Sequence, residues 1–149
     1  RRQRQMCIRD SNFGVAPIRA ATTADTFKAA LYLTTGSIDA STTAYTATGE
    51  VTGTNYSAGG VTVTNATVPA STNSSATAGV GYWTPSASIT YTNVTLSTAF
   101  NAMLLYNSTQ SNKAVGVYTF GSQTITAGTF ALTMPSNTTT TALLRISTT

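Results

Sequence analysis

The chain has 149 residues, enough for a hydrophobic core of its own. Histidine is absent, Lys, Arg, Asp and Glu together make up only 8% of the residues, and threonine is the commonest residue type. The composition excludes histidine acid–base chemistry and, because β-branched and aromatic residues alternate with small polar ones, favours an all-β fold over a helical one.

The first eleven residues, RRQRQMCIRDS, differ from the rest. They hold Arg1, Arg2, Arg4 and Arg9, half of the eight Lys and Arg residues of the chain, together with its only cysteine, Cys7. From residue 11 onward, the four remaining Lys and Arg residues nearly balance three carboxylates. The basic character that would suggest a polyanionic partner therefore rests on residues 1–11, and we expect no nucleic-acid partner.

Residues 1–11 also have an unusual back-translation. QMCIRDS can be written CAG-ATG-TGT-ATA-AGA-GAC-AGN, which resembles the mosaic end of transposase-based sequencing adapters. We therefore expect residues 1–11 to be a non-native, disordered scar, with the natural amino terminus missing, and leave them out of the fold prediction. Without Cys7 the chain offers no disulfide or thiol chemistry.

The remaining chain divides into an extended lead-in at residues 12–24 and one predicted domain at residues 25–149. Residues 26–35 alternate as a half-buried strand, with Phe27 and Leu31 on the same face. A long connection rich in turn residues follows, in which Ser41 could cap a short helical turn over residues 41–46.

Further strands are predicted where apolar residues alternate between turn signals. In residues 100–107 the alternation puts Phe100 on the same face as Ala102, and apolar residues on both faces predict a central strand. About eight short strands result, which is typical of a single β-sandwich, either immunoglobulin-like or jelly-roll; the pattern leaves both topologies open. The other predicted strands are residues 61–68, 80–84, 88–96, 113–120, 129–135 and 141–147, with a loop at 69–79.

Catalytic and metal-binding chemistry is poorly provided for. Beyond residue 11 the only carboxylates are Asp25, Asp39 and Glu50, each beside a turn or loop. Turn and cap roles explain them more simply than a catalytic pair meeting across a cleft, so we expect no enzymatic activity. Asp39 and Glu50 could share a calcium ion with carbonyl groups, but no loop signature supports this, and we expect no metal and no cofactor. No apolar run approaches the length of about 18 residues that a membrane span needs.

The aromatic residues are the better candidates for recognition. Tyr82 and Trp83 are adjacent in a predicted strand, so they point to opposite faces, one into the core and the other towards solvent or a partner. Core packing is the favoured interpretation of Trp83, ahead of an exposed platform for sugars. Tyr56 could pack under its own loop. Tyr56, Tyr82 and Trp83 are the candidate residues of a partner interface.

Three stretches carry a resemblance to a known family: DTFKAALY, YTATGEVTGTNYSAGG and LLYNSTQSNKAVGVYTFGS. They resemble small structural proteins from the virions of tailed bacteriophages, and the similarity covers most of residues 24–147. Residues 76–98 depart from the family pattern, in which a Trp lies in an acidic, Pro-containing strand, because VGYWTPSASITY has no acidic residue. The family therefore assigns no role to Trp83.

The resemblance implies a non-enzymatic component of the phage particle, with no catalytic residues to carry over. We expect a capsid decoration (cement) protein that stabilises the head shell, located in the virion. Its partners would be capsid proteins or other virion proteins. It would also associate with further copies of itself, commonly as a trimer in decoration proteins. We expect no association with a membrane. A tail or fibre component of the same particle is one alternative, and a secreted carbohydrate-binding β-sandwich module is another.

Overall fold

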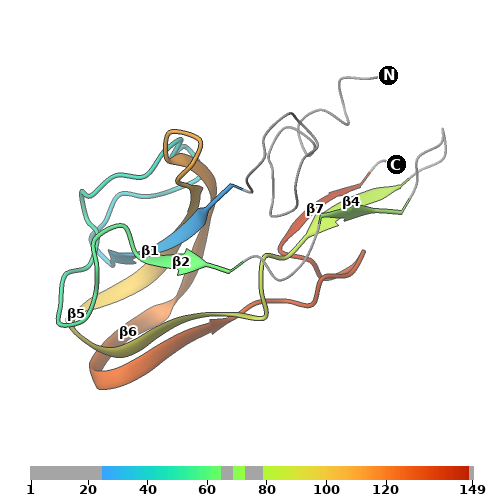
Figure 1. The fold of residues 1–149 in the computed structure, drawn as a ribbon. Helices are drawn as coiled ribbons and strands as arrows, with labels where there is room; N and C mark the ends of the chain where they lie inside the picture. Colours follow the sequence, from blue (N-terminus) through green and yellow to red (C-terminus); the bar gives the residue numbers. More distant parts are fainter. Residues whose placement is uncertain (1–24, 65–68, 73–78, 148–149) are drawn as a thin grey trace. The chain divides into compact units, whose positions relative to one another are not determined.

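The computed structural model describes residues 25–64, 69–72 and 79–147. This part of the chain is all-β, with seven strands in two antiparallel sheets and no helix (Figure 1). No helix in it is therefore long and apolar enough to cross a membrane. The expectations for residues 1–11 and 12–24 lie outside the described residues.

The strands are β1 (Phe27–Leu33), β2 (Val61–Val63), β3 (Ala70–Ser71), β4 (Val80–Trp83), β5 (Ser88–Asn107), β6 (Lys113–Thr133) and β7 (Leu144–Ser147).

The chain forms two compact units. The first, called the four-strand unit, comprises residues 26–63 and 89–132, and its sheet has the order β2-β1-β5-β6. The second, called the three-strand unit, includes residues 69–72, 79–88 and 133–147 among those described, and its sheet has the order β3-β4-β7. In the four-strand unit β1 pairs with β2 on one side, Phe27 opposite Val63, and with β5 on the other, Phe27 opposite Asn107.

Two strands are longer than the sequence pattern predicted. Residues 88–96 and 100–107, expected as separate strands, belong to one continuous strand of 20 residues, β5. Likewise β6 runs for 21 residues through residues 121–128, where a return turn was expected. The expected breaks contain no proline, and their Thr, Ser and Ala residues fit an extended ladder, so the strands continue.

The β5–β6 hairpin bends back on itself (Figure 1). The bend coincides with two residues in the left-handed backbone region, Asn93 (φ 52°) in β5 and Ala127 (φ 46°) in β6. The Ala127 amide donates to the Thr95 hydroxyl at 3.0 Å, so both irregularities lie at the same level of the hairpin. Phe120 and Phe130 lie ten residues apart, about 33 Å along a straight strand, yet their ring centroids are 5.4 Å apart. The hairpin thus encloses part of its own core.

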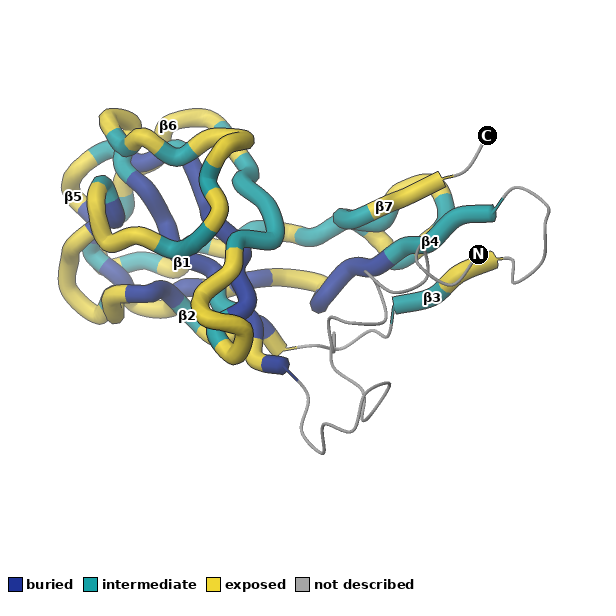
Figure 2. Tube along the Cα trace, turned by 90° about the horizontal axis from the view of Figure 1, so that it is seen from above, coloured by how far each residue is buried: buried dark blue, intermediate teal, exposed yellow. Residues whose placement is uncertain are grey.

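Both faces of β1 and of the adjoining end of β5 are buried, which confirms the predicted central strand (Figure 2). One face includes Phe27, and Ala29 lies opposite Leu105 there. The register shifts by one residue after Tyr32, so Phe100 pairs with Leu33 and packs against Phe120 and Phe130, not beside Ala102 as the alternation predicted. The opposite face carries the cluster Ala30, Tyr32, Ala102, Leu104 and Tyr106, covered by Ile38, Tyr45, Ala114 and Val117.

The predicted helical turn at residues 41–46 is wrong. Asp39 supplies the local turn instead: its carboxylate accepts hydrogen bonds from the Ser41 amide at 2.8 Å and the Ser41 hydroxyl at 2.6 Å. Beyond this turn the chain is extended, and Ala44 forms an antiparallel bridge with Lys113. An aspartate that bonds the backbone two residues ahead competes with helix formation, which explains the difference.

The three-strand unit is smaller. Its central strand β4 pairs with β3, Ala70 opposite Tyr82, and with β7, Trp83 opposite Leu144. Beyond β4 the Thr84 hydroxyl accepts a hydrogen bond from the Leu143 amide at 3.0 Å. The strands predicted at residues 80–84 and 141–147 are present as β4 and β7.

Candidate functional site

A buried carboxylate is the main chemical feature of the four-strand unit. Glu50 is only 8% exposed, and its oxygens are engaged by neutral donors. One oxygen accepts from the Tyr45 hydroxyl at 2.7 Å; the other accepts from the Tyr56 hydroxyl and the Gly59 amide, each at 2.8 Å. Burying an ionised group is costly unless such partners satisfy it, so these three donors hold the carboxylate in place.

The connection between β1 and β2 positions Glu50 beside the end of β1. Glu50 forms an antiparallel β-bridge with Tyr32, and the Val51 amide donates to the Leu31 carbonyl at 3.0 Å. Residues 50 and 51 therefore lie along the same edge of β1 as β2 does. The chain then leaves the edge in a loop that contains Tyr56 and returns at Gly60. Gly60 (φ 73°) is required there, because a Cβ atom would lie 1.7 Å from the Ala29 carbonyl oxygen.

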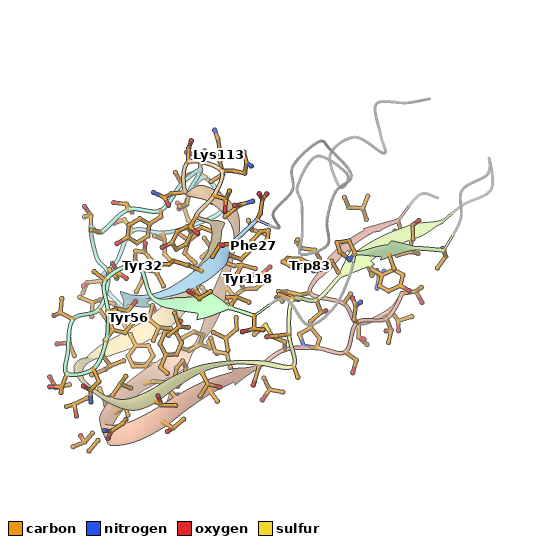
Figure 3. The ribbon with its side chains drawn as sticks, viewed as in Figure 1. Phe27, Tyr32, Tyr56, Trp83, Lys113 and Tyr118 are labelled. Atoms are coloured by element: carbon orange, nitrogen blue, oxygen red, sulfur yellow. The ribbon has the colours of Figure 1, made fainter. Side chains whose placement is uncertain are left out.

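Tyrosine side chains surround this carboxylate (Figure 3 labels Tyr32 and Tyr56). Tyr45 stacks on Tyr106 with 4.9 Å between ring centroids, and Tyr56 stacks on Tyr91 at 6.0 Å. Their hydroxyls also reach the backbone: Tyr106 donates to the Gly59 carbonyl and Tyr91 to the Ala29 carbonyl, both at 2.8 Å. We call Glu50 with these side chains the Glu50–tyrosine cluster: Glu50, Tyr32, Tyr45, Tyr56, Tyr91 and Tyr106.

The environment keeps these phenols protonated. Burial raises the pKa of Tyr32 to about 12, and the negative charge of Glu50 also raises it. Burial, assisted by the same charge, also raises the pKa values of Tyr45, Tyr56 and Tyr91 above their ordinary range. Phenols with raised pKa values act as hydrogen-bond donors at neutral pH and not as bases. The cluster therefore has a structural role: its hydrogen bonds fix the β1–β2 connection to the sheet.

The sequence suggested that Asp39 and Glu50 could conceivably bind one calcium ion together. The structure gives each carboxylate its own hydrogen-bond partners. Asp39 is exposed, and the hydrogen bonds from the Ser41 side chain and amide lower the pKa of its carboxyl group. Glu50 is committed to the tyrosines. Within residues 25–64, 69–72 and 79–147, no group of three or more His, Cys, Asp or Glu side chains could hold a metal ion.

The three candidate interface residues lie in different settings. Tyr56 belongs to the Glu50–tyrosine cluster, where its hydroxyl also accepts from the Leu31 amide at 2.9 Å, so it packs under its own loop as expected. Trp83 is 3% exposed, which agrees with core packing (Figure 3). Tyr82, its neighbour on β4, is half-buried. The structure thus places Tyr56 in the four-strand unit and the other two in the three-strand unit.

The sequence reasoning missed the Glu50–tyrosine cluster as a whole. A detectable signal was present: Tyr45, Glu50 and Tyr56 lie close together within residues 45–56 of the glycine-containing connection, in an otherwise nearly uncharged chain. A single carboxylate among tyrosines and glycines is unusual enough to predict a buried, hydrogen-bonded acid.

The described residues also line open hollows elsewhere. One, of about 440 Å³, lies in the four-strand unit between residues 38–42 of the connection and the start of β6. We call it the β6 groove; its apolar lining includes Ile38, Ala114 and Val117. The second, of about 300 Å³, lies in the three-strand unit and is lined by residues 84–87 and 134–137, except Pro85.

Comparison of the chain with protein-family models, with curated proteins and with solved structures finds no match.

Proposed function

We propose that this protein is a non-enzymatic structural component of a tailed-bacteriophage virion, and specifically a capsid decoration protein that stabilises the head shell. The observation that carries the proposal is where the family-like stretches fall in the fold. DTFKAALY lies at and within β1, YTATGEVTGTNYSAGG forms the connection that holds Glu50, and LLYNSTQSNKAVGVYTFGS forms the turn of the β5–β6 hairpin. The resemblance thus lies in residues that build one compact unit.

The chemistry of the Glu50–tyrosine cluster agrees with a structural role. Its only carboxylate accepts three hydrogen bonds from within the chain, from Tyr45, Tyr56 and Gly59. Such a carboxylate fixes a loop to a sheet. The cluster therefore supports a protein that works by holding a fixed shape.

The outward residues of the bent hairpin suit repeated weak contacts. Thr90 and Thr92 of β5 and Thr129 and Thr133 of β6 are exposed, and alternate with inward Ile89, Tyr91, Phe130 and Leu132. Hydroxyl groups donate and accept hydrogen bonds and carry no charge. Many copies of such a surface can bind a shell through avidity, even when each contact is weak.

Two finer features belong to the same proposal. We propose that the two sheets form a single β-sandwich, immunoglobulin-like or jelly-roll, and that the protein acts as a homo-oligomer, with Tyr56, Tyr82 and Trp83 near partner contacts. Tyr82 is the best placed of the three, because it is half-buried, whereas Trp83 is buried and the Tyr56 hydroxyl is bonded to Glu50.

The test uses phage heads of the particle that carries this protein, stripped of their native copies. Purified protein should sediment with the heads and raise their melting temperature in calorimetry. Tyr82→Ala should weaken this binding, whereas the control Leu33→Ala, at a half-buried residue at the end of β1, should bind as the wild type does if it remains folded. Binding to isolated tails but not to heads would assign the protein to the tail, and retention on a polysaccharide column without particle binding would favour a glycan-binding module.

A further inference from the structure

The outer edge of β6 is long and open. β6 is the last strand in the sheet order β2-β1-β5-β6, and it runs from Lys113 to Thr133. The connection forms hydrogen bonds only with its first residues: the Ala114 amide donates to the Thr43 carbonyl at 3.0 Å, and the Tyr45 amide to the Asn112 carbonyl at 2.9 Å. Residues 38–42 then lie across the β6 groove from the strand and form no backbone hydrogen bond with it. Past Ala114, no segment of the described chain pairs with this edge.

The alternation of an antiparallel strand identifies the outward backbone groups. Since the Ala114 amide points away from β5, the amides and carbonyls of every second residue after it point the same way. No left-handed residue interrupts β6 before Ala127, so this order holds through the first half of the strand. The outward set is Gly116, Tyr118, Phe120, Ser122 and Thr124.

Natural proteins protect such edges with charged side chains, prolines or very short strands. From residue 114 to residue 133 the chain has no Lys, Arg, Asp, Glu or Pro. Residues 121–124 are also exposed on both faces of the strand, and a Cβ atom at Gly121 would meet nothing within 4 Å. An uncharged edge of this length, uncovered on its faces as well, is a template for another strand.

A second copy of the chain is an occupant that the charges of the described residues permit. The described residues hold three cations, Lys28, Lys113 and Arg145, and three carboxylates, Asp25, Asp39 and Glu50, so their net charge is zero and does not oppose self-association. The exposed residues Ser122, Gln123 and Thr124 both donate and accept hydrogen bonds and carry no charge, so they can face a second copy without repulsion.

The opposite edge of the sheet is a poorer match for β6 in a head-to-tail pairing. Among the described residues, β2 has three there, Val61–Val63, against the long edge of β6. A two-fold pairing of β6 with β6 matches equal lengths and closes on itself. We propose that two copies associate through antiparallel pairing of their β6 strands over residues 116–124, which joins two four-stranded sheets into one. This inference does not depend on the proposed function.

The test measures the mass of the purified chain by sedimentation equilibrium across the micromolar range. The wild type should approach twice its 15.4 kDa mass as its concentration rises. A double variant, Ser122→Lys with Thr124→Lys, adds two positive charges per copy to a paired stretch that is otherwise uncharged, and should raise the dissociation constant about tenfold or more. The matched control, Thr90→Lys with Thr92→Lys, adds the same charge on the interior strand β5 and should leave the dissociation constant unchanged.

A second variant separates loss of pairing from loss of folding. Ser122→Pro removes an outward amide without removing a hydrogen bond to β5, and its circular dichroism spectrum should resemble that of the wild type. It should be monomeric. In the wild-type dimer, hydrogen exchange should be slow at the outward amides of Gly116, Tyr118 and Phe120, and faster in the double lysine variant. A wild type that stays monomeric throughout, a trimer, or a dimer that the lysine pair at residues 122 and 124 does not weaken would each overturn the proposal.

Discussion

The Tyr56 hydroxyl accepts a hydrogen bond from the Leu31 amide at 2.9 Å and donates one to Glu50 at 2.8 Å. One phenol therefore connects the backbone of the central strand β1 to the buried acid. A single side chain therefore joins the edge of β1, the loop that crosses it and the carboxylate of Glu50. Displacing any one of these three would expose the other two to solvent.

Replacing Glu50 should be among the most damaging single changes in the four-strand unit. Glu50→Ala leaves the Tyr45 and Tyr56 hydroxyls and the Gly59 amide without their acceptor, and should lower the free energy of unfolding by about 3 kcal/mol. Glu50→Gln keeps the shape and should cost about 1 kcal/mol. Urea denaturation measures both. Asp39→Ala, which removes an exposed carboxylate that bonds only its own turn, is the control and should lower stability much less than Glu50→Ala; equal losses at both positions would refute the structural role of Glu50.

Two glycines should respond oppositely to the addition of one methyl group. Gly60→Ala would place Cβ 1.7 Å from the Ala29 carbonyl oxygen at φ 73°, and should destabilise the protein by about 3 kcal/mol or more. Gly121→Ala meets nothing within 4 Å in β6 and should be neutral or slightly stabilising. Thermal unfolding compares them, and a Gly60→Ala protein that melts with the wild type would contradict the close approach of the loop to β1.

The bend in β6 predicts a substitution that stabilises the protein. Ala127 has φ 46°, a conformation that costs an L-residue with a Cβ atom about 1 kcal/mol or more. Ala127→Gly should therefore raise the free energy of unfolding by about 0.5 kcal/mol. Ala131→Gly, on the same strand without a positive φ, should lower it by about as much. If both substitutions destabilise equally in chemical denaturation, the left-handed bend at Ala127 is not present in solution.

The buried tyrosines predict sensitivity to alkali. Their pKa values in the folded state are raised above the ordinary value of 10.0, to about 12 for Tyr32, so the folded state keeps protons that the unfolded state releases. Stability is unaffected below pH 10 and falls as the pH rises from 10 through 12. Tyrosinate absorbance should show a late, cooperative transition that coincides with loss of the near-ultraviolet circular dichroism signal. Titration at the same pH in native and urea-denatured protein would contradict the burial of the cluster.

The sequence pattern predicted the all-β class and most strand positions, because alternation at β1, β4 and β7 is a local property. It did not predict the continuity of β5 and β6, since the exposed Ser, Thr and Gly residues between their apolar segments are equally suited to turns. The sequence pattern also could not predict the Glu50–tyrosine cluster. Tyr91 and Tyr106 of β5 belong to this cluster, and only the tertiary pairing of β5 with β1 brings them close to the connection.

The bend of the β5–β6 hairpin also bears on how the chain folds. Phe100, Phe120 and Phe130 pack ring against ring, and all three come from one hairpin whose strands are joined by a short turn. These contacts close short loops, so their entropic cost is low. By contrast, β1 pairs with β5 across a long stretch of chain, Phe27 with Asn107. The aromatic hairpin can thus collapse first and serve as the nucleus, with the insertion of β1 as the slow step that completes the sheet.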